Sequence, residues 1–150
     1  MSLNRELLGR RYESREPYEV ALVKVREFAR ALGDENPLYH DPAAARRAGY
    51  PHVIAPPTFA VVVAQAERLA MLRDPELGLD PARMLHTEQR FRYRRPIFAG
   101  DALLATAEIV DISVRGQHEV LAWRQELAAA DGDVICTLDG SVFSRGTAPA

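Results

Sequence analysis

The sequence has one cysteine, almost no net charge and no long apolar run, and each of these features excludes a class of protein. The lone Cys136 cannot form an internal disulfide, which fits a reducing cytoplasm. A formal net charge of -2 gives no general attraction to nucleic acid or to an anionic membrane. We therefore expect a cytoplasmic protein that binds no nucleic acid.

No segment has the character of a membrane anchor. The most apolar stretch, Phe59 to Leu72, is interrupted by Gln65, Glu67 and Arg68. A membrane-spanning helix needs about 18 consecutive apolar residues. The N-terminal residues also lack the apolar core of a signal peptide. These features predict no insertion into a membrane.

The sequence also lacks the common cofactor and nucleophile motifs. His52, His86 and His118 are widely scattered and do not have the spacing of metal ligands. There is no phosphate-binding loop of the Walker or dinucleotide type and no Gly-x-Ser-x-Gly turn. We expect neither a metal nor another cofactor.

The composition that remains is that of a globular domain. The 150 residues are 47% hydrophobic and 27% charged, which is enough to bury a core without disulfides. No internal repeat or linker is present. We predict a single domain over residues 1–146 and a disordered tail over 147–150.

Helical patterns and loops occupy the first half of the chain. Apolar residues recur with a helical period over 21–32, and Gly33 is a typical residue to end that helix. Asp41 followed by Pro42 predicts the start of a short helix that extends to residue 48. Residues 11–18 contain a proline and predict a short edge strand.

The most apolar helix is predicted from Pro57 to about Leu72. Its expected apolar face consists of Phe59, Val62, Val63, Ala66, Leu69 and Ala70. Much of the remaining helix surface is apolar too, so we expect other parts of the chain to enclose it.

Four segments after this helix have the patterns of strands, namely 84–96, 101–114, 117–129 and 133–145. Glycine-containing turns separate them, and the last three are close enough to form an antiparallel meander. Helices followed by a run of strands predict an α+β fold. We expect the hot-dog architecture, in which an antiparallel sheet wraps around one long central helix.

Residues 33–40 have the sequence GDENPLYH and follow the helix over 21–32. Gly, Asp, Asn and Pro are ordinary turn residues, so backbone chemistry alone can account for them. However, the loop precedes the long helix and can lie along the groove beside it. A carboxylate and an imidazole that lie close together there could hold a water molecule and move protons.

Three segments resemble the MaoC-like, or R-specific enoyl hydratase, family: FARALGDENPLYHD (28–41), VIAPPTF (53–59) and RFRYRRPIFAGD (90–101). Within the family, the chain is similar to the MaoC-type N-terminal domain group, which includes HadA-like and HadC-like subunits of (3R)-hydroxyacyl-ACP dehydratases. The resemblance implies a hot-dog fold and reversible hydration of a trans-2-enoyl thioester to the (R)-3-hydroxyacyl thioester. It implies an acyl-CoA or acyl-ACP substrate.

The catalytic motif of that family is altered here. Asp34 matches the family's catalytic Asp, and Asn36 matches its orienting Asn. The family's His falls five residues after its Asp, which is Tyr39 in this chain, and His40 follows one residue later. Active members commonly carry His-Gly where this chain has Pro56-Pro57, and proline has no N–H to stabilise an oxyanion.

The resemblance therefore implies candidate catalytic residues Asp34, His40 and Asn36, with the Thr58 amide as the donor that could replace the missing one. It implies substrate-binding residues Tyr39, Pro57, Thr58 and Arg92. The two alterations indicate a subunit that shapes the acyl channel. Such a subunit pairs, as a homodimer or heterodimer, with a second MaoC-like hot-dog subunit that performs the chemistry. Activity of this chain alone through Asp34 and the shifted His40 is the alternative.

Two other functions remain open from the sequence. A hot-dog acyl-thioesterase would place its acid on the long helix, where Glu67 is the candidate. A non-catalytic acyl-binding or regulatory hot-dog protein would need no proton chemistry. The alternating Arg90, Arg92 and Arg94 could bind phosphates of a carrier, or form a solvated face with Glu88.

Overall fold

The computed structural model describes residues 2–149. The helices are α1 (Leu22–Ala31), α2 (Pro42–Arg47), α3 (Ala60–Val63) and α4 (Gln65–Leu72). The strands are β1 (Arg11–Glu13), β2 (Tyr18–Glu19), β3 (Met84–Tyr93), β4 (Ala102–Arg115), β5 (His118–Ala128) and β6 (Val134–Ser144). Single turns of 3-10 helix occupy Arg5–Leu7, Pro37–Tyr39 and Pro81–Arg83. Within residues 2–149, no helix has both the length and the apolar character required to cross a membrane.

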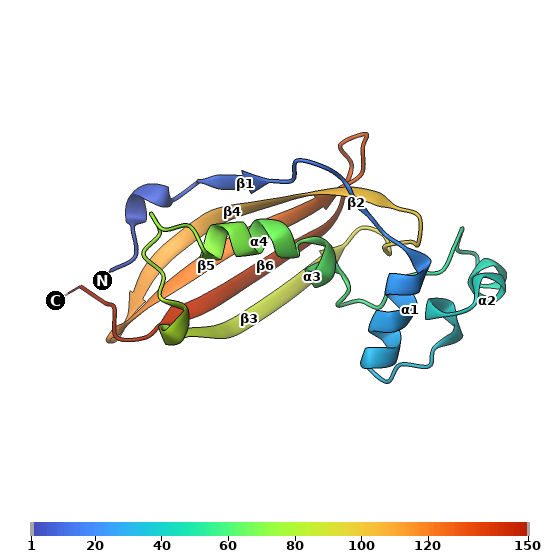
Figure 1. Cartoon of the computed structure of the whole chain (residues 1–150), viewed down its shortest axis with the longest axis horizontal. Coiled ribbons are helices and arrows are strands. Elements are labelled where there is room, and N and C mark those ends of the chain that lie inside the picture. The colour runs from blue at the N-terminus through green and yellow to red at the C-terminus, as the bar shows by residue number, and fades with distance from the viewer. Residues whose placement is uncertain (1, 150) are drawn as a thin grey trace.

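The strands form one antiparallel sheet in the order β1-β4-β5-β6-β3, and β2 pairs with β4 outside this path. The predicted meander is confirmed, because β4, β5 and β6 are neighbours in chain order. In Figure 1, α3 and α4 lie along one face of the sheet, and α1 and α2 stand beyond one end of it. The predicted α+β arrangement of an antiparallel sheet on a central helix is therefore confirmed.

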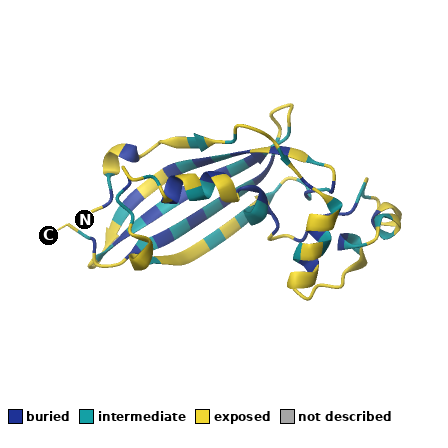
Figure 2. Cartoon of the chain, viewed as in Figure 1, coloured by how far each residue is buried: buried dark blue, intermediate teal, exposed yellow. Residues whose placement is uncertain are grey.

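Alternation along the strands determines which side chains face the helix. In β5, alternate residues are buried, and the residues between them are half-buried or exposed. Figure 2 shows the same banding on the neighbouring strands. Because successive side chains of a strand point to opposite faces, the buried row faces α3 and α4, and the other row faces outward.

The predicted helix from Pro57 to Leu72 is interrupted at Ala64. This residue has φ -89° and ψ 10°, and its carbonyl accepts a 2.6 Å hydrogen bond from Gln125 Nε2. The predicted apolar face is wrong in part, since Ala66 and Ala70 are exposed. The buried residues of this segment are Phe59, Ala60, Val63, Ala64, Glu67, Met71 and Leu72. The prediction assumed one regular helix covered on most sides, whereas the sheet covers one side of two shorter helices.

Glu67 lies on the buried side of α4 because it has a hydrogen-bond partner there. The Ser14 hydroxyl donates to Glu67 Oε1 at 2.8 Å and accepts a hydrogen bond from the Ala105 N–H at 2.8 Å. An isolated carboxylate would be costly at this depth. This chain of contacts connects the N-terminal segment to both α4 and β4.

The N-terminal segment differs from its prediction. The single edge strand expected over 11–18 is instead two short strands, β1 and β2, on either side of Pro17, which cannot donate to a ladder. At the other end, within the tail predicted over 147–150, Thr147 is buried and donates to the Ser144 carbonyl at 3.0 Å. Ala150 lies outside the described residues.

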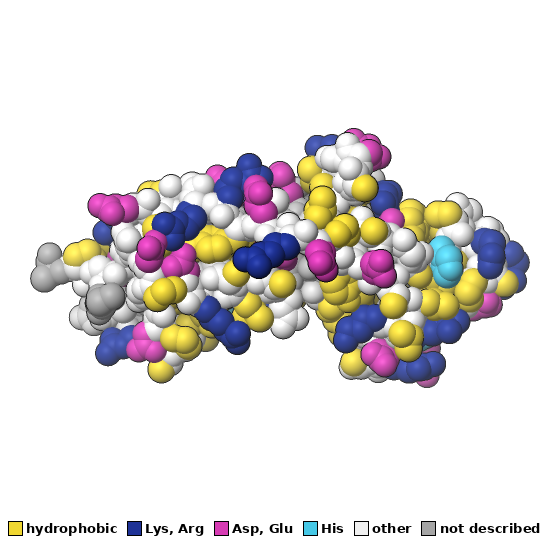
Figure 3. Space-filling view, turned by 45° about the horizontal axis from the view of Figure 1, so that its top comes forward, with side chains coloured by type: hydrophobic (Ala, Val, Ile, Leu, Met, Phe, Trp, Pro, Cys, Tyr) yellow, Lys and Arg dark blue, Asp and Glu magenta, His cyan; other side chains and the backbone are white. Residues whose placement is uncertain are grey.

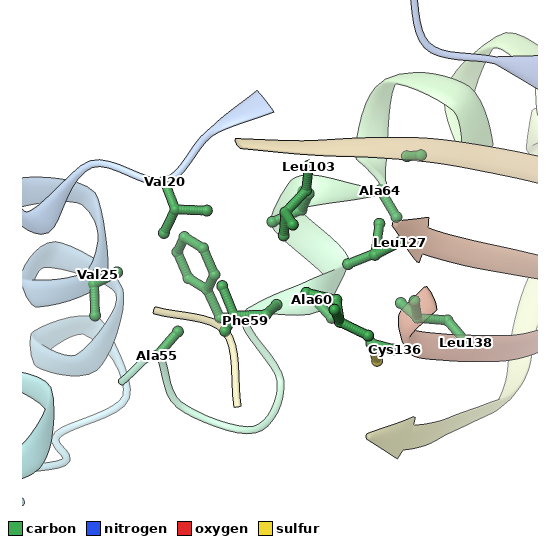
Figure 4. Packing of buried hydrophobic residues seen from close by; sticks show 14 of the residues in the cluster. Val20, Val25, Ala55, Phe59, Ala60, Ala64, Leu103, Leu127, Cys136 and Leu138 are labelled. Carbon is green, nitrogen blue, oxygen red and sulfur yellow. The ribbon is translucent and has the colours of Figure 1, made fainter. Parts of the chain in front are cut away.

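Phe59 connects the sheet, α1 and the start of α3. It is fully buried, and its ring centroid lies 5.4 Å from that of Phe28 in an edge-to-face contact at 88°. Figure 4 shows Phe59 surrounded by Val20, Val25 and Ala55, with the core continuing to the sheet. These contacts determine where the chain enters α3, and therefore where the preceding turn lies.

A substitution at Gly140 tests the close packing beneath α4. A Cβ at this position would lie 2.4 Å from Trp123 Cζ2 and 2.6 Å from Trp123 Cε2. We expect Gly140→Ala to lower the free energy of unfolding by about 1–3 kcal/mol, as overpacked cores do. The measurement is urea denaturation followed by circular dichroism. Thr137→Ala, on the outward face of the same strand, is the control and should change stability by less than about 0.5 kcal/mol. Equal midpoints for both variants would contradict the packing.

Candidate functional site

Short-range hydrogen bonds hold the loop over 33–40. Gly33, with φ 69°, ends α1. Asp34 Oδ1 accepts from the Asn36 N–H at 3.0 Å, and Asn36 Oδ1 accepts from the Leu38 N–H at 3.1 Å. One oxygen of each side chain therefore stabilises the turn, as the backbone interpretation of this loop expects.

The His40 imidazole is engaged within the same loop. Its Nε2 lies 2.8 Å from the carbonyl oxygen of Asp34, and because a carbonyl can only accept, Nε2 must carry the proton. The His40 carbonyl accepts from Arg26 Nε and Nη2 at 2.9 and 2.7 Å. Asp34 and His40 both line an open hollow of about 460 Å³. They share a hollow, but the hydrogen bond of the imidazole goes to the Asp34 backbone.

Tyr39 lines a different pocket. Only 8% of its surface is exposed, and it packs in a cluster with Ala29 and Ile54. Successive residues of a 3-10 turn diverge by about 120°, so neighbouring side chains lead to different sides. Burial raises the pKa of the Tyr39 phenol, and the negative charge of Asp34 raises it further. A hydrogen bond with the Asn36 side chain lowers the pKa by a smaller amount. The phenol is therefore neutral at physiological pH.

The pocket has a volume of about 340 Å³ and is lined by Tyr39, Ile54, Ala55, Pro57, Tyr93, Arg94, Arg95 and Pro96. Tyr39 and Pro57, expected to bind substrate, meet here. Thr58 and Arg92 are not among its lining residues. The loop histidine and the pocket thus lie in separate hollows, and the residue that enters the pocket is Tyr39.

The turn before α3 has few backbone donors. Pro57 lacks an N–H, and its carbonyl accepts the Tyr93 hydroxyl at 2.5 Å. The Phe59 N–H donates to the Pro56 carbonyl at 2.9 Å. Within residues 2–149, the N–H of the exposed Thr58 has no hydrogen-bond acceptor. The Thr58 amide is thus available as a donor, although its residue does not line the pocket.

Tyr93 is a pocket residue that sequence reasoning missed. Alternation in RFRYRRP places Tyr93 on the face opposite Arg92, and this signal could have identified it. Burial raises the pKa of its phenol above the ordinary value, with a further contribution from Cys136. Burial likewise raises the pKa of the Cys136 thiol to about 11. Neither group is ionised near neutral pH, so neither can serve as a base there.

The arginines of the 90–101 segment have different partners. Arg90 pairs with Glu88 at 3.1 Å, and Arg92 pairs with Asp139 at 2.6 Å. Arg92 therefore belongs to the outward face of the sheet, and its expected substrate-binding role has no support in this geometry. Arg94 lines the pocket, and no acidic side chain within residues 2–149 forms an ion pair with it.

Asp101 clamps the wall of the pocket. Its carboxylate accepts from Arg95 Nη1 and Nη2 at 2.8 and 3.0 Å, and from the Phe98 N–H at 2.7 Å. The Arg95 guanidinium also lies 5.0 Å from the Phe98 ring centroid. The backbone beside the clamp pairs with the proline-rich segment, since the Ala55 N–H donates to the Ile97 carbonyl at 2.8 Å. Segments distant in the sequence therefore form one rigid wall.

Glu67, the candidate acid of a thioesterase, lies away from the Tyr39 pocket and from the hollow lined by Asp34 and His40. Its carboxyl is buried against Ser14, and it does not line either hollow beside residues 33–40. The thioesterase alternative therefore has no support in the geometry. Among residues 2–149, no group of three or more His, Cys, Asp or Glu side chains is arranged to hold a metal ion.

Known proteins resemble this chain both in a family model and over whole chains. The family model described as FAS1-like, dehydratase domain region matches residues 6–138. A UPF0336 protein of Thermobifida fusca is 47% identical over 150 residues, which are 100% of this chain and 99% of the relative.

Solved structures agree with the family match. A protein described as a MaoC-like dehydratase has a TM-score of 0.87 and 34% identity over 93% of this chain, which spans 42% of that longer chain. The HadBC (3R-hydroxyacyl-ACP dehydratase) complex from Mycobacterium tuberculosis contains a chain with a TM-score of 0.83 and 26% identity. That match covers 91% of this chain and 96% of the solved one. The hot-dog fold and the MaoC-like resemblance expected from the sequence are confirmed.

Replacement of Asp101 tests the clamp. Asp101→Asn removes the charge that holds Arg95 and weakens the acceptor for Phe98. We expect a loss of about 1.5–3 kcal/mol in the free energy of unfolding, the usual range for hydrogen bonds to charged groups. Asp133→Asn, in the exposed turn between β5 and β6, removes the same charge and is the matched control. Urea denaturation of both variants compares them, and the clamp has no structural role if their midpoints coincide.

Proposed function

This chain belongs to the FAS1-like dehydratase family, and from that premise we propose that it is a subunit of an (R)-specific 3-hydroxyacyl-thioester dehydratase, or trans-2-enoyl-thioester hydratase. In this proposal the chain shapes the acyl channel. A second MaoC-like hot-dog subunit supplies the Asp–His pair that performs the chemistry. The substrate is an acyl-CoA or acyl-ACP of fatty-acid metabolism in the cytoplasm.

The observation that carries this proposal is the placement of Tyr39 in the pocket and of His40 outside it. A phenol with a raised pKa is protonated at neutral pH and cannot take a proton from water. The Nε2 proton of His40 is engaged by the Asp34 carbonyl. The pocket of this chain therefore lacks the base that hydration of an enoyl thioester requires.

The Pro57 turn also supports a complex in which the partner subunit performs the chemistry. A developing enolate oxygen needs a preorganised donor, and loss of one such donor costs about 2.7–4 kcal/mol of barrier. General acid–base catalysis increases the rate by a further factor of roughly 10²–10⁴. A pocket that has no base, and whose lining does not include the Thr58 amide, is too slow to serve as the catalytic centre. The two-subunit HadBC complex among the structural relatives makes a hetero-complex a reasonable arrangement for this chain as well.

The first test is an assay of the purified chain for hydration of short and long trans-2-enoyl-CoA thioesters. The loss of enoyl absorbance measures the reaction. We expect no turnover by the chain alone. We expect turnover after co-expression with a MaoC-like subunit that carries the intact Asp–His pair.

Variants of this chain within the active complex assign the chemistry. Asp34→Asn and His40→Ala should change kcat by less than about twofold, because neither side chain reacts with substrate. The same replacements of the partner's own Asp and His should abolish turnover. Turnover by this chain alone that disappears with His40→Ala would instead make the shifted histidine catalytic and overturn the proposal.

A further inference from the structure

The edge of β4 that faces β1 is paired along only part of its length. β4 extends past β1 toward the end of the sheet where both chain termini lie (Figure 1). The Gly9 N–H donates to the Ile109 carbonyl at 2.8 Å, and within residues 2–149 this is the last main-chain bond on that side of β4. The residues before Gly9 turn onto the buried face of the sheet, where Leu7 packs with Ile112. The end of β4, over 111–115, therefore has no neighbouring strand on this side.

The free edge of β4 carries main-chain groups that can pair with another strand. A two-residue turn joins β4 to β5, and Arg115 and His118 form the pair that closes it. Residues of an antiparallel ladder bond alternately to the two sides, so Arg115 and Ser113 bond to β5. Ile112 and Val114 direct their N–H and C=O groups to the open edge. Unpaired main-chain groups in a row are a template for a strand of another chain.

Apolar side chains flank this edge. Val110 and Val114 are 46% and 47% exposed, and Leu8 on the adjoining segment is 48% exposed. They are three of the seven large hydrophobic side chains that lie exposed in the described part of the chain. Figure 3, turned so that the β1 side of Figure 1 comes forward, shows acidic, basic and hydrophobic side chains interspersed on this side. The edge therefore has apolar surface to bury and no excess of one charge that would repel a copy of itself.

The charged side chains of the free segment have no ionic partner in their own chain. Asp111 and Arg115 are exposed, and with Ser113 they line one hollow of about 370 Å³ on the outer face of the sheet. Within residues 2–149, neither forms an ion pair, whereas Arg90 on the same face pairs with Glu88. Opposite charges four residues apart on one face of a strand are neutralised when an identical strand pairs with it in antiparallel orientation.

We propose that the free end of β4 is a docking site for a second copy of this chain, which adds its own β4 in antiparallel orientation. Residues 111–115 have the sequence DISVR, which is self-complementary about Ser113. With the twofold axis at Ser113, Asp111 of each copy lies opposite Arg115 of the other on the outer face of the joined sheet. The same surface patch serves both copies, as a twofold interface requires.

The main chain favours the same register. About Ser113, Ile112 of each copy lies opposite Val114 of the other, and the two residues exchange both of their main-chain hydrogen bonds. An axis at Val114 would set Arg115 opposite Ser113 and lose the ion pairs. An axis at Ile112 would require the edge at Ile109, which Gly9 already occupies. The free charges and the free main-chain groups are thus paired together only about Ser113.

The contact is small, so the association is weak. A few strand residues with Leu8 and Val110 give less buried area than a stable complex has, and we expect a dissociation constant of roughly 10–100 µM. This inference goes beyond the proposed function, since no residue of the Tyr39 pocket or of the loop over 33–40 takes part. In the two-subunit complex, the contact would join two complexes through this chain.

Sedimentation velocity of the purified chain over a range of about 1–300 µM measures this association. Arg115→Asp sets like charges opposite each other on both sides of the axis, so we expect the dissociation constant to rise roughly tenfold or more. Arg46→Asp makes the same charge change on exposed α2, beyond the other end of the sheet, and is the control that should leave association unchanged. A native chain that stays monomeric, or an association that Arg115→Asp does not weaken, would overturn the proposal.

A charge exchange tests the register. The double variant Asp111→Arg, Arg115→Asp restores opposite charges across the axis, and we expect its dissociation constant to return to within about threefold of the native value. A double variant that associates as weakly as Arg115→Asp alone would rule out pairing about Ser113. Both side chains are exposed, and circular dichroism checks that each variant is folded.

Turnover separates this inference from the proposed function. Arg115 lies outside the Tyr39 pocket, so Arg115→Asp should leave hydration by the two-subunit complex unchanged. Hydration of enoyl-CoA by this chain alone would contradict the proposed function and leave the sedimentation result interpretable. Loss of association without loss of turnover is the result expected of a docking edge.

Discussion

The contact of Phe59 with α1 and with the core of the sheet is the interaction on which the rest of the site depends. Full burial of an aromatic side chain contributes roughly 1.5–3 kcal/mol, and its edge-to-face contact with Phe28 adds to that. Phe59 is the last residue before α3, so its position determines the direction of the preceding turn. The Pro56-Pro57 turn, the pocket wall and the neighbouring loop all take their places from this contact.

The histidine of the loop comes one residue later than in the family motif, and this shift determines the chemistry of the loop. Pro37–Tyr39 forms one turn of 3-10 helix, and His40 follows directly after it. Tyr39 is drawn into the cluster with Ala29 and Ile54, because its ring has apolar surface to bury. His40 is left at the half-buried margin, where its Nε2 donates to the Asp34 carbonyl and its own carbonyl accepts from Arg26. The same loop geometry that could position a catalytic histidine here positions a tyrosine.

A pocket without a catalytic base is compatible with function in an assembly of two similar subunits. When one subunit retains the Asp–His pair, the other is free to lose it while its fold and pocket persist. In the proposed complex, the apolar walls of this pocket serve binding, and the groups that it lacks are those that react. A base and an oxyanion donor are needed only in a transition state, whereas apolar walls and a neutral donor stabilise a ground-state complex.

Residue patterns in the sequence predict much of the secondary structure and several of the turn contacts. Local chemistry determined α1 and its glycine end, α2 with its Asp41 cap, the four long strands, the turn roles of Asp34 and Asn36, and the missing N–H at Pro57. These depend on nearest neighbours and on backbone chemistry, which a single sequence displays. The MaoC-like resemblance supplied the expectation of a thioester site and located its alterations.

Only the tertiary structure decided which side chains meet. The break at Ala64 depends on Gln125, which lies 61 residues away, and the burial of Glu67 depends on Ser14, 53 residues away. The wall clamped by Asp101 and the inward position of Tyr93 likewise require strands and loops to be packed together. The sequence alone determined the elements and the chemical inventory, because these follow from short-range interactions. The 3-10 turn directs Tyr39 and His40 to different sides, but only packing against Ile54, 15 residues away, decided that Tyr39 is the one in the pocket.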